Sequence, residues 1–394
     1  MISEDEARAR ILESVSPLPR ERVALPDALD RFAARELRAT IPLPRFDNSA
    51  MDGYAVIASD ATNGARLRVI GEQPAGVSRE LCISAGESVR ILTGAPIPRN
   101  ADAVVMQEET ACDGDRIVIA AGEVRAGDFI RKASSDLAVG QTIVECGQRL
   151  GPAALALLAS QGHADIEVHQ RASVAVVTTG DEVVAAGHEL RAGEIYDSNA
   201  VMLSALARQT NAELVMQKHC RDELDALYAS LEEGMRADVL VISGGVSVGA
   251  RDLVREALEK LGAKLDVWRV LIKPGKPFLF GTQGNCGIFG LPGNTVSSFV
   301  TFLVFVRPAL LRMMGAQDTE LELPRTCARL ARDIVGDDTR PHYFRGELCG
   351  GEFRLAGRQE SHALFGLARA NALLRVAAGE TLAAGQLVQA LLIT

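Results

Sequence analysis

The sequence predicts a multidomain chain of the α/β plus β class. Its 394 residues exceed what one hydrophobic core usually serves, so two to four domains are expected. From residue 173 to about 314, short β-branched runs alternate with helical patterns, which is typical of a parallel sheet covered by helices. On both sides of that segment, at 46–140 and from 320 onward, short strands separated by turn residues indicate β domains.

The N-terminal segment 3–38 is predicted to be helical. Ser3 is a suitable N-cap, and Glu6 would complete a capping box. A partial helical stripe supports the later part of the segment: Ala28, Leu29, Phe32, Ala33 and Leu37.

A hinge and a β domain are predicted next. Two prolines within 41–46 favour extended backbone there. The polar loop 47–53 then leads into a short strand, and further strands are expected at 67–70, 88–92, 103–106 and 116–119. An Ala/Leu-rich helix is predicted at 150–161. If this helix pairs with the first helices, the β domain is an insertion into a helical one.

Three glycine-rich polar loops follow strands of the predicted α/β segment. The predicted strands are 174–177, one starting at 213, 239–242 and 286–289, and the predicted helices are 198–208, 224–231, one starting at 253, and 295–314. The loops are 178–182, 243–249 and 290–294. Because carboxyl ends of parallel strands share one sheet edge, where α/β folds bind ligands, these loops should converge on one site.

The stretch 238–252 carries the clearest chemistry. A strand, a glycine loop and a helix bring backbone N–H groups and a helix N-terminus against an anion. Asp252 at the end of the loop would repel a bare anion, so it is either a helix cap or a ligand of a metal ion that bridges to the anion. With Asp181 and Glu182 it would supply the oxygen ligands that Mg²⁺ prefers.

Other loop residues allow either a functional or a purely structural interpretation. Lys273 and Lys276 share one Pro-Gly turn and predict a local anion site in a chain of net charge −9. The alternative is two solvated surface lysines. For Asp52 and Thr93 the alternative is turn chemistry, because Asp, Thr, Gly and Pro are what turns use.

Composition excludes several classes. The net charge of −9 and an aromatic content of 4% argue against nucleic-acid binding. Seven scattered cysteines without a Cys-x-x-Cys motif favour reduced thiols in a cytoplasmic protein. The most apolar run, 299–306, stops at Arg307-Pro308, so no membrane span is expected. No nucleophile has an adjacent base. The pattern therefore suits Mg²⁺-assisted phosphate or oxyanion transfer with a phosphorylated or nucleotidyl ligand.

Six motifs, in order along essentially the whole chain, resemble those of the MoeA family. That family is the molybdopterin molybdenumtransferases, and its eukaryotic relatives include gephyrin. The motifs are DNSAMDGYAV at 47–56, TGAP at 93–96, TGDE at 179–182, SGGVSVG at 243–249, KPGKP at 273–277 and LPGN at 291–294.

The resemblance implies a homodimer of four-domain subunits. A discontinuous helical domain (1–45 and 141–170) would carry an inserted β domain (46–140). An adenylyltransferase-like three-layer α/β domain that binds molybdopterin (171–318) and a C-terminal β barrel (319–394) would follow.

The resemblance also implies a reaction: Mg²⁺-dependent insertion of molybdate into adenylylated molybdopterin, with release of AMP. A molybdopterin adenylyltransferase and apo-molybdoenzymes are the implied partners. The implied catalytic residues are Asp52, Thr93, Glu182 and Asp252. The implied substrate-binding residues are Asp181, Asp222, Ser243, Gly244, Gly245, Ser247, Pro292 and Asn294. The implied molybdate-binding residues are Lys273, Lys276, Ser297, Arg345 and Ser361.

Three positions depart from the family pattern. Thr295 replaces a second proline, Ser135 lies where a glutamate is usual, and Glu360 replaces a glycine before Ser361. Two alternatives to the molybdenumtransferase stay open. One is a molybdopterin adenylyltransferase-like enzyme, since the Ser-Gly-Gly loop also occurs in that family. The other, motivated by the departures, is a non-catalytic paralogue that binds cofactor or acts as a scaffold.

Overall fold

The computed structural model describes residues 1–77, 79–245 and 253–393, which form two compact units. Residues 1–35, 145–156 and 163–394 make up unit 1, and residues 36–144 and 157–162 make up unit 2. The four-domain boundaries drawn from the sequence stay predictions beside this two-unit division.

Unit 2 is built on a six-stranded sheet of order β8-β5-β7-β6-β10-β9. Neighbouring strands are antiparallel except for the parallel pair β6–β7. All four strands predicted after the first one are present. The strands are β5 (Gly53–Val56), β6 (Arg66–Gln73), β7 (Glu87–Ile91), β8 (Ala103–Met106), β9 (Thr110–Asp113) and β10 (Arg116–Ile119).

Short ladders and turns complete unit 2. The strands β3 (Leu37–Arg38) and β12 (Thr142–Val144) form one ladder, and β4 (Asn48–Ser49) and β11 (Ile130–Arg131) form another. The 3₁₀ turns η2 (Ala58–Asp60) and η3 (Gln107–Glu109) follow β5 and β8.

The prediction of a helical segment at 3–38 is wrong beyond its first third. After the bridge strand β1 (Ile2–Ser3), the helix α1 spans only Glu4–Ser14, with Ser3 accepting from the Glu6 N–H at 3.1 Å as predicted. Beyond it lie β2 (Arg20–Ala24) and the 3₁₀ turn η1 (Leu25–Ala28). Prolines 17, 19 and 26 disfavour helix there, and β2 pairs instead with the distant strand β13 (Asp165–His169). The helix predicted at 150–161 is α2 (Pro152–Ser160).

The centre of unit 1 is a six-stranded sheet of order β17-β14-β18-β22-β21-β19. The first four strands are parallel, and β21 runs antiparallel to both of its neighbours. The strands are β14 (Ser173–Thr179), β17 (Glu213–Cys220), β18 (Val239–Ser243), β19 (Lys264–Trp268), β21 (Leu279–Gln283) and β22 (Cys286–Leu291). Small ladders add β15 (Val183–Val184) with β16 (Ile195–Tyr196), and β20 (Val270–Leu271) with β1.

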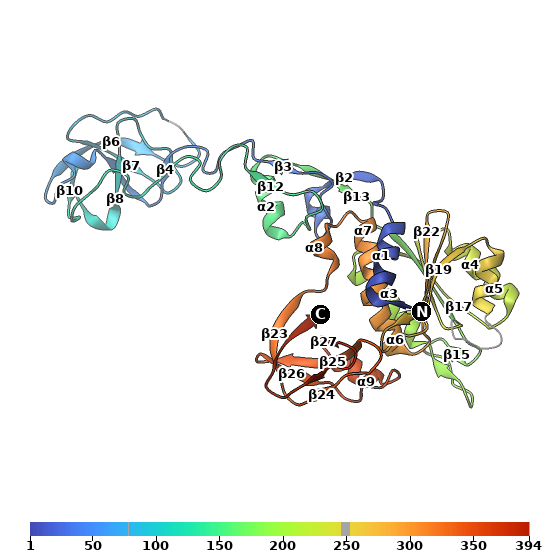
Figure 1. Cartoon of the computed structure of the whole chain (residues 1–394). Coiled ribbons are helices and arrows are strands. Elements are labelled where there is room, and N and C mark those ends of the chain that lie inside the picture. The colour runs from blue at the N-terminus through green and yellow to red at the C-terminus, as the bar shows by residue number, and fades with distance from the viewer. Residues whose placement is uncertain (78, 246–252, 394) are drawn as a thin grey trace. The chain divides into compact units, whose positions relative to one another are not determined.

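Helices cover both faces of this sheet, as Figure 1 shows. Alternate residues of β14 enter different cores: Val174 and Val176 pack in the core shared with α1 and α3 (Ser198–Gln209). Ala175 and Val177 pack in the core shared with α4 (Leu224–Gly234) and α5 (Leu253–Lys260). A strand buried on both faces needs a continuous apolar run, which is why β14 and β18 could be predicted.

A 19-residue helical run crosses the core of unit 1. It consists of α6 (Thr295–Thr301), a π-helical turn η4 (Phe302–Val306) and α7 (Arg307–Met313). The helix predicted at 295–314 is confirmed over 295–313, and it continues past Pro308, which follows the π-turn immediately, where the hydrogen bonding is already altered. The run is long and apolar enough to cross a membrane, but 78% of it is buried inside the protein, as expected for a core helix.

The C-terminal part of unit 1 is a closed barrel, β23-β26-β25-β27-β29. Its strands are β23 (Arg325–Leu330), β25 (His342–Cys349), β26 (Glu352–Leu355), β27 (Ala372–Val376) and β29 (Leu387–Leu392). The short elements α8 (Asp318–Leu321), β24 (Ile334–Val335), α9 (Leu364–Arg369) and β28 (Thr381–Leu382) accompany them. The β domain predicted from residue 320 onward is confirmed by this barrel.

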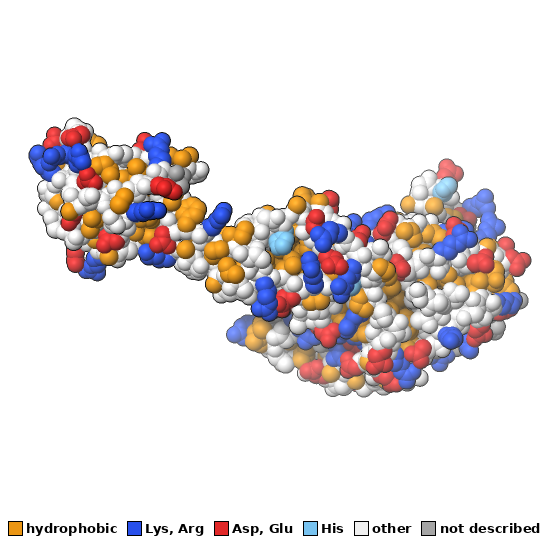
Figure 2. Space-filling view, turned by 90° about the horizontal axis from the view of Figure 1, so that it is seen from above, with side chains coloured by type: hydrophobic (Ala, Val, Ile, Leu, Met, Phe, Trp, Pro, Cys, Tyr) orange, Lys and Arg blue, Asp and Glu red, His pale blue; other side chains and the backbone are white. Residues whose placement is uncertain are grey.

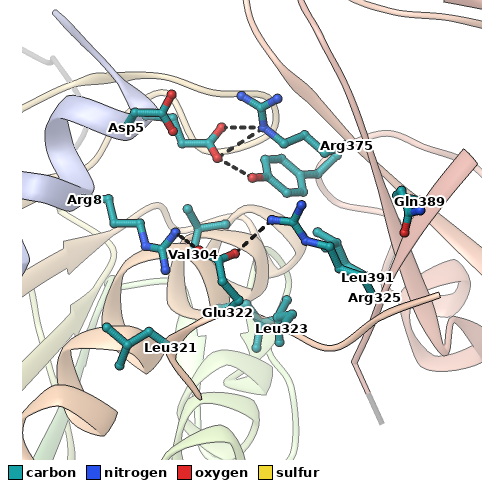
Figure 3. Close-up of a pocket in the computed structure, with 13 residues that line it drawn as sticks. Asp5, Arg8, Val304, Leu321, Glu322, Leu323, Arg325, Arg375, Gln389 and Leu391 are labelled. Carbon is teal, nitrogen blue, oxygen red and sulfur yellow. Dashed lines mark hydrogen bonds and ion pairs between the residues drawn. The ribbon is translucent and has the colours of Figure 1, made fainter. Parts of the chain in front are cut away.

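Contacts between charged residues join α1 to the barrel. The buried Glu4 carboxylate accepts from the Tyr343 hydroxyl and pairs with Arg375 at 3.3 Å. Arg8 and Arg325 both pair with Glu322 at the edge of the same pocket, which has a volume of about 410 Å³ (Figure 3). On the face of the molecule seen in Figure 2, side chains of both charge signs are interspersed.

Candidate active site

The sheet of unit 1 has its topological switch point between β14 and β18. The chain leaves β14 through α3 to β17 on one side, and returns through α4 to β18 on the other. A pocket of about 450 Å³ opens at the carboxyl ends of these strands, where such folds bind ligands. The described parts of the three loops predicted to converge do so. These predicted site residues line the pocket: Glu182, Asp222, Ser243, Gly244, Gly245, Pro292, Asn294 and Ser297.

Gly244 allows the β18 loop to approach β14. Its φ is +97°, and a Cβ at this position would lie 2.5 Å from the carbonyl oxygen of Thr179. Any side chain would therefore force the two strand ends apart.

A hydroxyl and amide network forms the base of the pocket. Asn199 Nδ2 donates to Ser243 Oγ at 2.9 Å and to the Gly293 carbonyl at 2.7 Å. Ser298 is completely buried and donates to the Pro292 carbonyl. The network fixes the β22 loop against the β18 loop, so the two walls of the pocket are held in one geometry.

Carboxylates line the β14 side of the pocket. Thr179 Oγ1 donates to Asp222, and the Asp222 N–H donates to Asp181 Oδ1 at 3.2 Å. Asp197 is buried, caps α3 by accepting from the Ala200 N–H at 2.9 Å, and accepts from Thr178 Oγ1 at 2.6 Å. Sequence reasoning missed Asp197 and Asn199, although the run Asp-Ser-Asn at a helix start was a signal of a cap.

A loop of the barrel packs on the N-terminal end of α6. Asn294 Nδ2 donates to Ser361 Oγ at 3.0 Å, and the Val296 N–H donates to the Ser361 carbonyl at 3.2 Å. These contacts bring Ser361 beside the pocket, and its role in binding an oxyanion stays a prediction.

Arg345 supports this loop from inside the barrel. Its side chain is 1% exposed and donates to the Glu360 carbonyl at 3.1 Å and to the Arg358 carbonyl at 2.5 Å. Burial lowers the pKa of its guanidinium. In this geometry Arg345 shapes the backbone that carries Ser361, and it presents almost no surface to a molybdate ion.

The lysine turn lies against the start of β25. The Lys273 N–H donates to the Pro341 carbonyl at 2.9 Å, and the Tyr343 N–H donates to the Lys273 carbonyl at 2.7 Å. Pro277 of the same turn lines the pocket. Lys273 is not a free surface cation, because its Nζ lies 3.2 Å from Asp337 Oδ2. Lys276 is exposed and has no ion-pair partner within the described part of the chain.

Asp52 and Thr93 form a local pair in unit 2. Asp52 Oδ1 accepts from the Thr93 N–H and from Thr93 Oγ1, both at 2.7 Å. The backbone hydrogen bond, followed by the hydroxyl bond, lowers the pKa of Asp52. These hydrogen bonds join the loops of the two motifs. The same bonds are expected if Asp52 and Thr93 only stabilise turns, which was the structural alternative.

The donor set near β14 fits Mg²⁺. Asp181 and Glu182 offer carboxylate oxygens, and Mg²⁺ needs only one or two carboxylates besides water and substrate phosphate. Asp252, predicted as a further ligand, and Ser247 lie outside the described residues. Within residues 1–77, 79–245 and 253–393 no group of three or more His, Cys, Asp or Glu side chains could hold a metal ion.

The fold and pocket define an α/β protein with a polar pocket at the switch point of its parallel sheet. Three family models match the chain: the MoeA N-terminal region over residues 2–162, a probable molybdopterin-binding domain over 175–312, and the MoeA C-terminal region over 327–393.

Relatives with sequences or structures similar to this chain match it along most or all of its length. The chain is 35% identical to a molybdopterin molybdenumtransferase from Haemophilus influenzae over 97% of both chains. It is 36% identical to one from Nostoc sp. over 92% of this chain and 86% of the relative. The crystal structure of a molybdopterin biosynthesis MoeA protein from Pyrococcus horikoshii superposes over 100% of both chains, with a TM-score of 0.86 and 27% identity.

The chain therefore belongs to the MoeA family of molybdopterin molybdenumtransferases, which makes it a transferase of molybdenum cofactor biosynthesis.

Proposed function

We propose that the chain inserts molybdenum from molybdate into adenylylated molybdopterin, with Mg²⁺ present, and releases AMP. The observation that carries the proposal is the junction of the switch-point pocket with the barrel loop through Asn294 and Ser361. It supports a site in which a nucleotide-like ligand and an oxyanion lie side by side.

The pocket residues suit the nucleotide and pterin part of the ligand. Gly244 and Gly245 line the pocket without side chains that would shield the loop backbone, and the 19-residue helical run begins at Thr295 with its positive dipole end toward the pocket. Ser243 and Ser297 add hydroxyls. Together they would hold a phosphate in a chain whose net charge of −9 otherwise repels it.

Asp181 and Glu182 would hold Mg²⁺ at the phosphate. A bound ion would supply charge neutralisation at the phosphate, which would favour departure of AMP. The residues of the chain orient the two substrates: the pocket fixes the adenylylated pterin, and Lys273, Lys276 and Ser361 attract and align molybdate. Arg345 supports Ser361, and the Asp52–Thr93 loop pair acts in the same reaction.

The test is molybdate-dependent AMP release by the purified chain. With adenylylated molybdopterin, Mg²⁺ and molybdate, AMP should appear and an added apo-molybdoenzyme should become active. Consumption of ATP with unadenylylated molybdopterin would indicate the adenylyltransferase alternative. Tight pterin binding without AMP release would indicate the non-catalytic paralogue, and in both cases the proposal would fall.

Two further properties belong to the proposal. We infer that the chain works as a homodimer, which sedimentation of the purified protein tests. We also infer that it works in the cytoplasm. Its seven cysteines, all within the described residues, are free thiols, which supports a reducing compartment. Fractionation of cells tests this location.

A further inference from the structure

Asp337 holds two cations at the edge of the oxyanion region. Its loop precedes β25, and its Oδ2 lies 3.2 Å from Lys273 Nζ and 3.4 Å from Arg340 Nη2. One carboxylate oxygen thus brings an ammonium and a guanidinium together. No motif in the sequence pointed to Asp337 or Arg340, because Lys273 and Asp337 are far apart along the chain.

The carboxylate is itself fixed. Asp337 Oδ1 accepts from the Thr339 N–H at 3.0 Å and from Thr339 Oγ1 at 2.8 Å. The Thr339 backbone bond above all, then the Thr339 hydroxyl, Lys273 and Arg340, holds the pKa of Asp337 well below its usual range. Asp337 is therefore ionised at neutral pH and cannot turn away from the cations without losing two hydrogen bonds.

The cations remain accessible to a ligand. The Lys273 side chain is 40% exposed and that of Arg340 23% exposed. Arg340 Nη1 also donates to the Ile272 carbonyl at 3.4 Å, which ties it to the lysine turn. Lys276 lies in the same turn as Lys273 and its side chain is exposed, so the lysine turn and Arg340 together offer positive charge to an anion such as molybdate.

His342 adds no charge to this group at neutral pH. Burial first, then the neighbouring Lys273, lowers the pKa of His342 to about 4. Its ring contacts Phe344 at 3.8 Å between centroids. The charge facing the ligand is therefore set by Lys273, Lys276, Arg340 and Asp337.

We propose that Asp337 is a positioning residue for the oxyanion substrate, holding Lys273 and Arg340 as one cation pair. The inference rests on the proposed function, because it names molybdate as the ion that the pair receives. Without the carboxylate, the two cations repel each other and their side chains spread apart. A dianion then loses two charge-assisted hydrogen bonds that were fixed in advance.

The test is Asp337→Asn, which keeps the shape of the side chain and removes its charge. We expect the KM for molybdate to rise about tenfold, while kcat at saturating molybdate stays within about twofold. Asp337→Glu should recover part of the loss. Asp338→Asn is the matched control, because Asp338 is the exposed neighbour in the same loop, and its molybdate KM should stay at the wild-type value.

A double-mutant cycle separates positioning from general damage. If Asp337 acts through the cations, Asp337→Asn should add little to the molybdate KM of the Lys273→Met/Arg340→Gln variant. An unchanged or lower molybdate KM in folded Asp337→Asn, or full additivity in the cycle, overturns the inference. A lower KM would mean that Asp337 competes with the substrate for Lys273.

Calorimetry with molybdate alone separates this inference from the proposed function. If the wild-type chain binds molybdate and Asp337→Asn weakens that binding, the positioning role stands even where no AMP is released. If AMP is released but Asp337→Asn changes neither the affinity for molybdate nor the KM for molybdate, the proposed function stands and the positioning role falls.

Discussion

Asn294 donates a 3.0 Å hydrogen bond to Ser361 and so connects the pocket of the α/β sheet with a loop of the C-terminal barrel. Ser361 also accepts, through its backbone carbonyl, from the Val296 N–H at the start of α6. The barrel loop thus supplies a partner to a helix end that would otherwise carry unsatisfied N–H groups. The C-terminal barrel is for this reason part of the candidate active site.

Removing the Ser361 hydroxyl should weaken catalysis more than folding. We expect Ser361→Ala to lower the rate of AMP release about fivefold, because the pocket loses one hydrogen bond worth about 1 kcal/mol. Ser59→Ala, at an exposed serine of unit 2, is the control and should be as active as the wild type. A fully active Ser361→Ala enzyme would disconnect the barrel loop from the reaction.

Glu182 should set the magnesium requirement. With one carboxylate ligand removed, Glu182→Gln should need roughly tenfold more Mg²⁺ for half-maximal AMP release. Glu189→Gln, at an exposed position between β15 and β16, should keep the wild-type magnesium dependence. If Glu182→Gln and the wild type show the same dependence of AMP release on Mg²⁺ concentration, Glu182 is not a ligand of the metal ion.

The Glu4 contact should stabilise unit 1. Glu4 is 8% exposed and bonds to both Tyr343 and Arg375. Glu4→Gln leaves the arginine without its countercharge and should cost about 2 kcal/mol of unfolding free energy, measured by denaturant titration. Asp5→Asn, at the exposed neighbour, should change stability by less than about 0.5 kcal/mol. If both variants unfold alike, the contact does not stabilise the fold.

His342 should make the barrel sensitive to acid. Because burial lowers its pKa to about 4 from an ordinary 6.5, only the unfolded state binds a proton between these values. The stability that the neutral, buried imidazole contributes is complete above pH 6.5 and is lost as the pH falls toward 4, amounting to about 3 kcal/mol. His342→Gln should flatten the stability profile in this window, whereas His362→Gln, at an exposed position, should leave it unchanged. If the unfolding free energy of His342→Gln depends on pH between 4 and 6.5 as steeply as that of the wild type, His342 is not the group responsible.

Much of the α/β fold could be predicted because its strands are buried on both faces. The apolar runs at 174–177 and 239–242 contribute side chains to two hydrophobic cores, one on each face of the sheet. The loops after them contain glycine because the neighbouring strand ends lie close together. The strand β19 was missed because Lys264 and Asp266 interrupt its apolar pattern. The helix predicted beyond residue 14 failed because β2 pairs with a strand more than a hundred residues away.

The candidate site also contains residues that the sequence predicts and residues that it does not. Loop residues such as Ser243 and Asn294 could be predicted, since they follow strands whose ends share one edge. The ion pair of Lys273 with Asp337 and the burial of Arg345 could not, because they depend on how the barrel packs against the lysine turn. Such long-range contacts leave no periodicity in the sequence.

The most direct test of the central claim measures molybdenum and AMP in one reaction. Purified chain is incubated with adenylylated molybdopterin, Mg²⁺ and labelled molybdate, and metal bound to the pterin is quantified beside the AMP released. The account predicts that both appear together in equal amounts and that neither appears when molybdate is omitted. Release of AMP with no metal on the pterin, or no release at any molybdate concentration, would contradict it.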